Sequence, residues 1–326
     1  MEQQPLISLV VPCYNEAEVF PHLRRELCAL ADKLADKYRC EFVLVDDGSR
    51  DTTWAQITAF AAEDDRVRAI SLSRNFGHQM ALTCGYDMAA GDAVICLDAD
   101  LQDPPEVAAQ MIAKWEEGAD VVYGVRNRRA GESKFKLWTA AAFYRLFQRF
   151  GDSAAPADAG DFRLMSKRGL EAFRQLREQH RYVRGMVGWI GFRTATVAYD
   201  RQPRAAGQTK YPLTRMLAFA ADALISFSSF PLRLAYVFAF ASAALIFGYL
   251  LFTLAKYLFL GQELVRGWTS LILAIAVFGF ATLFSLGIIG EYIGRIYVQT
   301  KNRPLYLVRE MIERRQSQDE TKPFNT

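Results

Sequence analysis

Two long stretches without a charged residue limit what this chain can fold into. Residues 234–255 (LAYVFAFASAALIFGYLLFTLA) and 268–290 are each long enough to exceed the ~20 residues that a helix needs to cross a bilayer. Both lie too far from the N-terminus to be a signal peptide. Buried helices of a large soluble core are the alternative, but such helices rarely stay uncharged over this length. We therefore predict two membrane-spanning helices.

The basic residues beside these stretches predict their orientation, because cytosolic flanks carry an excess of Lys and Arg. The connecting loop, residues 256–267, holds only two basic residues, Lys256 and Arg266. The outer flanks hold Arg215, Arg233, Arg295, Lys301, Arg303 and Arg309. We expect the N-terminal domain and the C-terminal tail to share the cytosolic side.

Composition argues against several other functions. The net charge of +3 is small, so we expect no nucleic-acid partner. The five cysteines form no C-x-x-C pair, which favours reduced thiols in the core of a cytosolic domain. The histidines at positions 22, 78 and 180 are far apart in the sequence, and we expect no zinc site from them.

The N-terminal part alternates apolar strand patterns with helical ones. The expected strands are 6–12, 41–47, 67–72, 93–98 and 120–125. This order predicts an α/β domain with a mostly parallel, doubly wound sheet and helices on both faces. We expect a cytosolic domain at 1–211, interfacial juxtamembrane helices at 212–233, a transmembrane region at 234–290, and a basic tail at 291–326 that ends in disorder.

Acidic side chains follow three of the expected strands, in segments 12–16, 46–51 and 98–106. Ligands of such sheets bind beyond the carboxyl ends of the strands. Asp98 and Asp100 leave one strand end on the same side, and two carboxylates that close share either a proton or a cation. A D-x-D also arises by chance, so the other acids of this rim matter: Glu16, Asp46 and Asp47. Together they favour a site for Mg²⁺ or Mn²⁺.

Two Gly-containing basic segments, 126–136 and 199–211, suggest a second, anionic ligand. Either segment alone could be a solvated loop. Segments 137–150 and 212–230 mix aromatic and basic residues, as helices at a membrane interface do, although packing against the core is the alternative. If they lie on the bilayer, the second anion is a lipid head group.

With these residues assembled, the chain resembles family 2 glycosyltransferases of the GT-A fold, close to the polyprenyl-phosphate sugar synthases. The matching segments are VPCYNE (11–16), VDDGSRDT (45–52), LDADLQDPPE (97–106), AGDFRLM (159–165), RYVRGMVGWIGF (181–192), RAAGQTKYPL (204–213) and LGIIGEYIGRIYVQTKNRPLY (286–306). The resemblance reaches dolichol-phosphate mannose synthases, and the C-terminal segment is closer to bacterial undecaprenyl-phosphate glucosyltransferases.

The resemblance implies inverting transfer of one sugar, with UDP-glucose as the expected donor, to undecaprenyl phosphate at the cytosolic face of a bacterial plasma membrane. It also implies roles for individual residues. Pro12, Tyr14, Glu16 and Asp46 would contact the nucleoside; Asp98, Asp100 and Gln102 would hold the metal; Asp161 would lie beside the sugar; and Arg126, Arg128, Ser133, Arg204 and Lys210 would contact the acceptor phosphate or the diphosphate. Asp100 and Asp161 are the expected catalytic residues, and a homotetramer is the expected assembly.

A phosphate monoester is largely dianionic at neutral pH, so this reaction needs no strong base. Asp161 could act as a base, position the sugar, or only end a strand or cap a helix. Three rival functions remain: the same reaction with another sugar, a membrane-tethered protein that binds nucleotide sugars without catalysis, and a processive polysaccharide synthase. The last is disfavoured because the chain lacks a Q-x-x-R-W motif and has only two expected spans.

Overall fold

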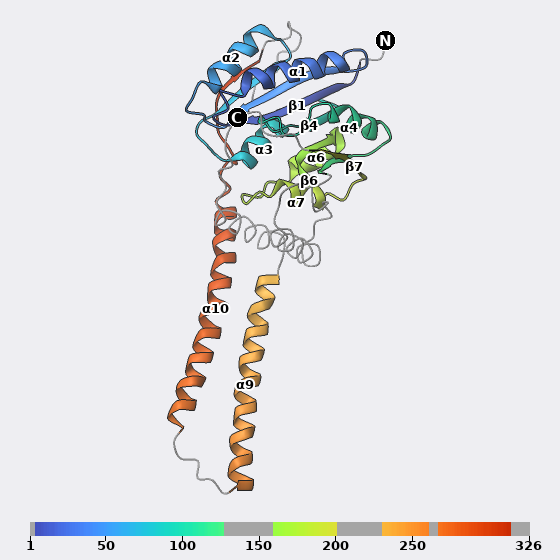
Figure 1. Ribbon diagram of the computed structural model, residues 1–326. Coiled ribbons are helices and arrows are strands. Elements are labelled where there is room, and N and C mark those ends of the chain that lie inside the picture. The colour runs from blue at the N-terminus through green and yellow to red at the C-terminus, as the bar shows by residue number, and fades with distance from the viewer. Residues whose placement is uncertain (1–3, 127–158, 201–229, 261–266, 314–326) are drawn as a thin grey trace. The chain divides into compact units, whose positions relative to one another are not determined.

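The computed structural model describes residues 4–126, 159–200, 230–260 and 267–313 (Figure 1). These residues fall into two compact units. One lies within Met1–Trp138, Ser153–Tyr211 and Pro304–Thr326, and the other within Thr139–Asp152 and Pro212–Arg303. The first unit therefore includes Pro304–Thr326, which follows both apolar stretches in the sequence.

The first unit contains a sheet of eight strands in the order β7-β5-β6-β4-β1-β2-β3-β8. The strands are β1 (Leu6–Cys13), β2 (Arg39–Asp46), β3 (Val67–Leu72), β4 (Ala93–Cys96), β5 (Val121–Arg126), β6 (Ala159–Ser166), β7 (Thr194–Tyr199) and β8 (Val308–Ile312). The parallel pairs are β1 with β2, β1 with β4, β2 with β3, and β5 with β7. The pairs β4–β6, β5–β6 and β3–β8 are antiparallel. The predicted, mostly parallel sheet is confirmed.

Helices cover both faces of this sheet (Figure 1). The helices of the unit are α1 (Phe20–Leu34), α2 (Thr53–Glu63), α3 (His78–Met88), α4 (Val107–Glu116), α6 (Lys167–Gln175) and α7 (Val183–Trp189). On one face, α1, α2 and α4 share a buried cluster with alternate residues of β1, including Leu9. Each fully buried leucine there contributes about 1.5–3 kcal/mol.

On the opposite face, α3 lies close to β1. A Cβ atom on Gly85 would lie only 2.3 Å from Cγ1 of Val10, so the helix can approach the strand this closely because residue 85 has no side chain. This contact fixes how closely α3 packs against the sheet. Helix α3 begins at His78.

Three strands, β6, β7 and β8, were not expected from the sequence. Strand β7 pairs with β5 at one edge of the sheet. Antiparallel β6 carries the GDFRLM motif and lies between β4 and β5. Strand β8 pairs with β3 at the edge of the sheet. The tail was expected only to be basic and to end in disorder, whereas residues 308–312 form part of the sheet.

The second unit contains the long helices α9 (Phe230–Leu260) and α10 (Trp268–Thr300). Their segments Ala235–Lys256 and Ala274–Thr300 are long and apolar enough to cross a membrane, and few of their described side chains are buried. The two helices contact each other, with the rings of Phe238 and Phe284 only 4.7 Å apart between centroids. The predicted stretches lie inside these longer helices, whereas the expected interfacial segment lies almost wholly outside the described residues.

Candidate active site

The ends of β1 and β2 place the first two predicted motifs side by side. Cys13 pairs with Asp46 in the parallel register. The Asp46 side chain is fully buried, and its carboxylate accepts hydrogen bonds from Ser49 N (3.1 Å) and Ser71 Oγ (3.1 Å). Asp46 thus connects the 46–51 loop to Ser71 on β3 through its carboxylate.

The same two loops are joined directly. Asn15 N donates to Ser49 Oγ (3.0 Å), and Asn15 Oδ1 accepts from Arg50 N (2.9 Å). Asn15 has a positive φ of 54°, a conformation that asparagine tolerates better than most residues. Beside it, the Tyr14 side chain is 41% exposed and available to a ligand.

Other residues of these loops have fixed structural contacts. Pro12 is buried within β1, and Glu16 N donates to Thr53 Oγ1 (2.9 Å). Asp47 accepts hydrogen bonds from Phe76 N (2.7 Å) and Gly77 N (2.9 Å), which lead into α3. Burial raises the pKa of the Asp47 carboxyl, and these two amides oppose the shift. Asp47 therefore connects the second strand end to the start of α3.

The D-x-D loop follows β4. One oxygen of Asp98, Oδ1, is buried without a hydrogen-bond partner, and His78 Nε2 lies 3.8 Å from it. Burial raises the pKa of Asp98 to about 6, an effect that His78 opposes and that Asp161, Asp103 and Asp100 reinforce. Asp100 Oδ1 accepts from Gln102 N (3.2 Å), which closes a tight turn at this loop.

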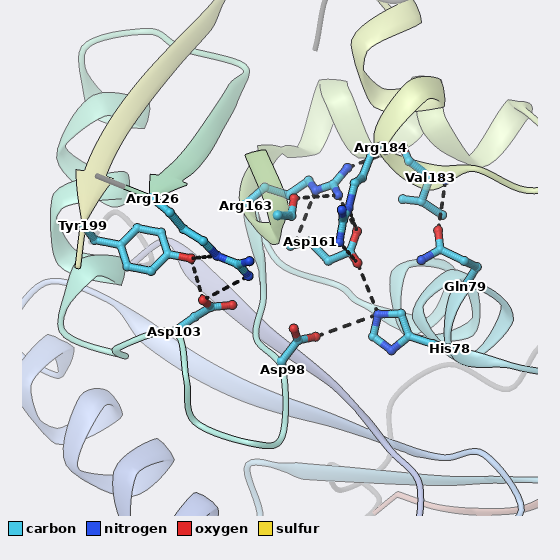
Figure 2. A network of polar contacts seen from close by, with 11 residues as sticks. His78, Gln79, Asp98, Asp103, Arg126, Asp161, Arg163, Val183, Arg184 and Tyr199 are labelled. Carbon is cyan, nitrogen blue, oxygen red and sulfur yellow. Dashed lines mark hydrogen bonds and ion pairs between the residues drawn. The ribbon is translucent and has the colours of Figure 1, made fainter. Parts of the chain in front are cut away.

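Figure 2 shows that His78 lies between Asp98 and Asp161. Its Nε2 atom is 3.4 Å from Asp161 Oδ2. Burial lowers the pKa of the imidazole, but the two carboxylates outweigh this effect and raise it overall. His78 therefore joins α3 to the acids on both β4 and β6.

Asp161 is almost fully buried and is bound by two arginines (Figure 2). Arg184 donates to both of its oxygens, from Nε to Oδ1 (3.1 Å) and from Nη2 to Oδ2 (3.0 Å). Arg163, with no exposed surface, donates from Nη2 to Oδ1 (2.8 Å). Burial alone would raise the pKa of Asp161, but Arg184, His78 and Arg163 together hold it well below its ordinary value.

This environment argues against two of the roles considered for Asp161. A carboxylate with such a low pKa is a weak base, because protonation would break its ion pairs. The residue also lies within β6, so it neither caps a helix nor ends a strand. Its negative charge instead orients Arg184 and His78.

A third group of side chains fixes the far end of the D-x-D loop. Asp103 is buried and accepts a hydrogen bond from the Tyr199 hydroxyl on β7, and Arg126 Nη2 lies 3.6 Å from its Oδ1 (Figure 2). Arg126 Nε also donates to the Tyr199 hydroxyl (3.4 Å). The guanidinium that was expected to contact phosphate thus contacts the acidic loop here.

The described residues bring the predicted acids together, with Asp98 and Asp161 both contacting His78. Arg128, Ser133, Arg204 and Lys210 lie outside the described residues. Sequence reasoning missed the roles of His78, Arg163 and Arg184. A signal for His78 existed, because it follows the expected strand 67–72, whose carboxyl end faces the same rim.

A divalent cation fits the donor set of the D-x-D loop. Asp98 Oδ1 accepts no hydrogen bond, and a cation could bind there. Carboxylate and amide oxygens are ligands that Mg²⁺ and Mn²⁺ accept. Within the described residues, no group of three or more His, Cys, Asp and Glu side chains is placed to hold a metal. A cation here would therefore take further ligands from water or from a bound phosphate.

Comparison with known proteins identifies the class. Residues 8–174 match the sequence profile of glycosyl transferase family 2. The uncharacterized glycosyltransferase YkcC of Bacillus subtilis is 44% identical, over 93% of both chains. The SfII prophage-derived bactoprenol glucosyl transferase of Shigella flexneri is 38% identical over 93% of this chain and 97% of its own. A prophage bactoprenol glucosyl transferase homolog of Escherichia coli K12 is 37% identical over 94% and 99%.

The sheet, its acidic rim and these relatives define a glycosyltransferase of the GT-A fold. The profile covers half of the chain, and several relatives match over nearly their full length. The chain belongs to glycosyl transferase family 2, as its motifs predict.

Proposed function

We propose that this enzyme transfers glucose from UDP-glucose to undecaprenyl phosphate, with inversion at the anomeric carbon. The observation that carries the proposal is the cluster of Asp98, His78 and Asp161 at the carboxyl ends of the strands, with an unpartnered carboxylate oxygen on Asp98. The names of two relatives, which describe glucosyl transfer to bactoprenol, support glucose as the sugar and a polyprenyl lipid as the acceptor.

In this proposal, each part of the rim has one task. Tyr14, with its exposed ring, and the loop around Asp46 bind the nucleoside, and Pro12 and Glu16 shape the same pocket. Asp98, Asp100 and Gln102 would hold Mg²⁺ or Mn²⁺, which would offset the charge that develops on the leaving diphosphate.

The chemistry on the acceptor side needs no proton removal. The acceptor phosphate is largely dianionic at neutral pH, so one of its oxygens can attack the anomeric carbon directly. Asp161 is held ionised by Arg184, Arg163 and His78, so its task is to position these groups beside the sugar. Rate enhancement then comes from orientation and from fixed charges.

The apolar helices α9 and α10 support a membrane location for a lipid substrate. The distribution of Lys and Arg favours a cytosolic catalytic unit in the plasma membrane of a bacterium. Gly287, Gly290 and Gly294 offer a small-residue face on α10, where an added Cβ would meet no atom within 4 Å. Close helix packing at such a face would support the expected homotetramer, and cross-linking in detergent that yields only monomers would count against it.

The test is release of UDP from UDP-glucose by the purified full chain with Mg²⁺ or Mn²⁺, with and without undecaprenyl phosphate. Release that requires the lipid phosphate would support the proposal. Release without the lipid would indicate hydrolysis. No release with the lipid would reject glucose, and a panel of nucleotide sugars would then separate another sugar from a protein that only binds.

A further inference from the structure

The strand that follows the second apolar helix carries a distortion next to the site. Helix α10 ends at Thr300, and β8 begins at Val308. In the antiparallel pair of β3 and β8, Ser71 pairs with Glu310, but the next β3 residue, Leu72, pairs with Val308. Arg309 is therefore the extra residue of a β-bulge. Such bulges redirect a side chain and occur often beside active sites.

The redirected side chain reaches a buried hydroxyl. Arg309 Nη2 donates to Ser71 Oγ (2.8 Å), and Ser71 Oγ in turn donates to Asp46 Oδ2 (3.1 Å). Ser71 and Asp46 have no exposed surface. An arginine can only donate, and a serine hydroxyl has a single proton. Because Arg309 occupies a lone pair of Ser71, that proton is directed to Asp46.

From Asp46 the hydrogen bonds continue to the rim. Asp46 Oδ1 accepts from Ser49 N (3.1 Å), and Ser49 Oγ accepts from Asn15 N (3.0 Å). Asn15 is next to Tyr14, a residue that is 41% exposed. A continuous series of hydrogen bonds thus runs from the C-terminal strand to the two loops that would contact a nucleoside.

The segment that carries Arg309 is well anchored. Leu305 is buried, and the Tyr306 hydroxyl donates to Asp87 Oδ2 on α3 (2.9 Å). Ser73 N donates to the carbonyl of Leu307 (2.8 Å), which continues the contact between β8 and the residues after β3. The guanidinium of Arg309 is therefore presented from a fixed backbone.

We infer that Arg309 is a positioning residue for the nucleoside end of the sugar donor, and that it acts through Ser71 and Asp46 on the loops at 14–16 and 46–51. This inference rests on the proposed function, which gives those loops the nucleoside. It extends the donor site to the tail of the chain, beyond the α10 helix.

The test measures nucleotide binding by the full chain in detergent. We expect Arg309→Met and Ser71→Ala each to weaken UDP binding about fivefold or more, the effect of losing one hydrogen bond in the series. The KM for UDP-glucose should rise by the same factor while kcat stays unchanged, because the loops act on binding and not on the reacting atoms. Arg309→Lys should restore part of the affinity.

A matched control is available on the same edge. Glu313 pairs with Arg68 (2.8 Å) just after β8, away from Ser71. Glu313→Gln perturbs the attachment of the tail without touching the series, and UDP binding should be unchanged. Equal losses in Glu313→Gln and Arg309→Met would mean that docking of the strand alone matters, and would overturn the inference.

The double variant tests the route. If Arg309 acts through Ser71, the variant with both Arg309→Met and Ser71→Ala should bind UDP no more weakly than either single variant. Additive losses, or native affinity in Arg309→Met, would overturn the inference. If the native chain binds UDP but does not transfer glucose, only the proposed reaction fails, and the binding test still stands. If it binds none of UDP, GDP, dTDP and ADP, both proposals fail.

Discussion

The Nε2 atom of His78 lies 3.4 Å from Oδ2 of Asp161, so the first residue of α3 contacts a carboxylate in the middle of β6. The same nitrogen is 3.8 Å from Asp98 Oδ1. One imidazole thus contacts both the acid of the D-x-D loop and the acid of β6.

Replacing His78 with glutamine should lower turnover about tenfold or more, because small displacements of groups around a reacting centre are costly. Initial rates of UDP release at saturating substrates would measure the loss. His22, which is exposed on α1 and distant from these acids in the sequence, is the control. An equal rate in His78→Gln and His22→Gln would contradict a positioning role.

Asp100→Asn should lower turnover roughly 100-fold or more with the fold intact, since a contact that stabilises charge on the leaving group is worth ~2.7–4 kcal/mol. Asp36→Asn, at an exposed position after α1, provides the control for loss of a charge. Melting curves would establish that both variants are folded. Near-native turnover in Asp100→Asn would reject the metal assignment.

Asp161→Asn should destabilise the full chain by ~3–5 kcal/mol at pH 7, because it leaves the charge of fully buried Arg163 uncompensated. The pKa of Asp161 in the folded chain lies below its unfolded value of about 3.9. The carboxylate therefore stabilises the fold fully above pH 3.9, and this stabilisation is lost as the pH falls through the folded pKa. The melting temperature should therefore stay lowered from about pH 8 to pH 5. The difference should be larger at pH 5, because Asp161 also raises the pKa of His78, and the stability from that pair is present at low pH and lost as pH rises.

A suitable comparison is Asp64→Asn. The pKa of Asp64 is also lowered, chiefly by its hydrogen bond with Arg66, but the Arg66 side chain is 35% exposed. Loss of the ion pair between Asp64 and Arg66 should cost at most about 1 kcal/mol. If Asp161→Asn and Asp64→Asn have the same melting temperature, the buried ion pairs of Asp161 do not stabilise the fold as we expect.

Tyr199→Phe should weaken the binding of Mn²⁺ together with UDP, because it removes the hydroxyl that anchors buried Asp103 at the end of the D-x-D loop. A hydrogen bond to a charged group contributes about 1.5–3 kcal/mol. The control is Tyr38→Phe, whose hydroxyl donates to Glu116 at the other end of the strands. Titration calorimetry would measure the affinity for Mn²⁺ with UDP. Equal affinities in Tyr199→Phe and Tyr38→Phe would argue against a role for the Tyr199–Asp103 hydrogen bond.

Gly48→Ala should destabilise the chain more than Gly191→Ala does. Both glycines have positive φ, at 67° and 72°, so each substitution strains the backbone. At Gly48 the new Cβ would clash with the backbone, at 2.6 Å from the carbonyl carbon of Arg74, whereas at Gly191 it would make an ordinary contact, 3.8 Å from the carbonyl oxygen of Trp189. Chemical or thermal unfolding of both variants would measure the difference, and equal losses would show that the loop can move.

Local patterns predicted the strands β1 to β5 because each is an apolar run between helical segments. They did not predict β6, β7 and β8. Strand β6 lies between β4 and β5, and β7 and β8 pair with β5 and β3, which are far away in the chain. The edges of a sheet depend on such long-range pairing, which no short window of sequence contains.

The site shows the same limit. Asp98, Asp100 and Asp46 were predicted from their positions after strands, a local rule. Arg163 was missed because arginine is almost never fully buried unless it is paired, and its partner, Asp161, is paired in turn with Arg184 from a different element. His78 follows the expected strand 67–72, but its contacts with Asp98 and Asp161 depend on how α3 packs against the sheet, which its place in the sequence does not give.

Strand β8 has a practical consequence for preparing the catalytic unit without its two apolar helices. Stopping the chain before α9 would remove β8 together with the helices and leave β3 as an open edge strand. Unpaired edge strands associate with other chains, so such a truncated protein should aggregate. Replacing residues 230–303 with a flexible linker would instead keep both the edge strand and its bulged arginine in the soluble protein.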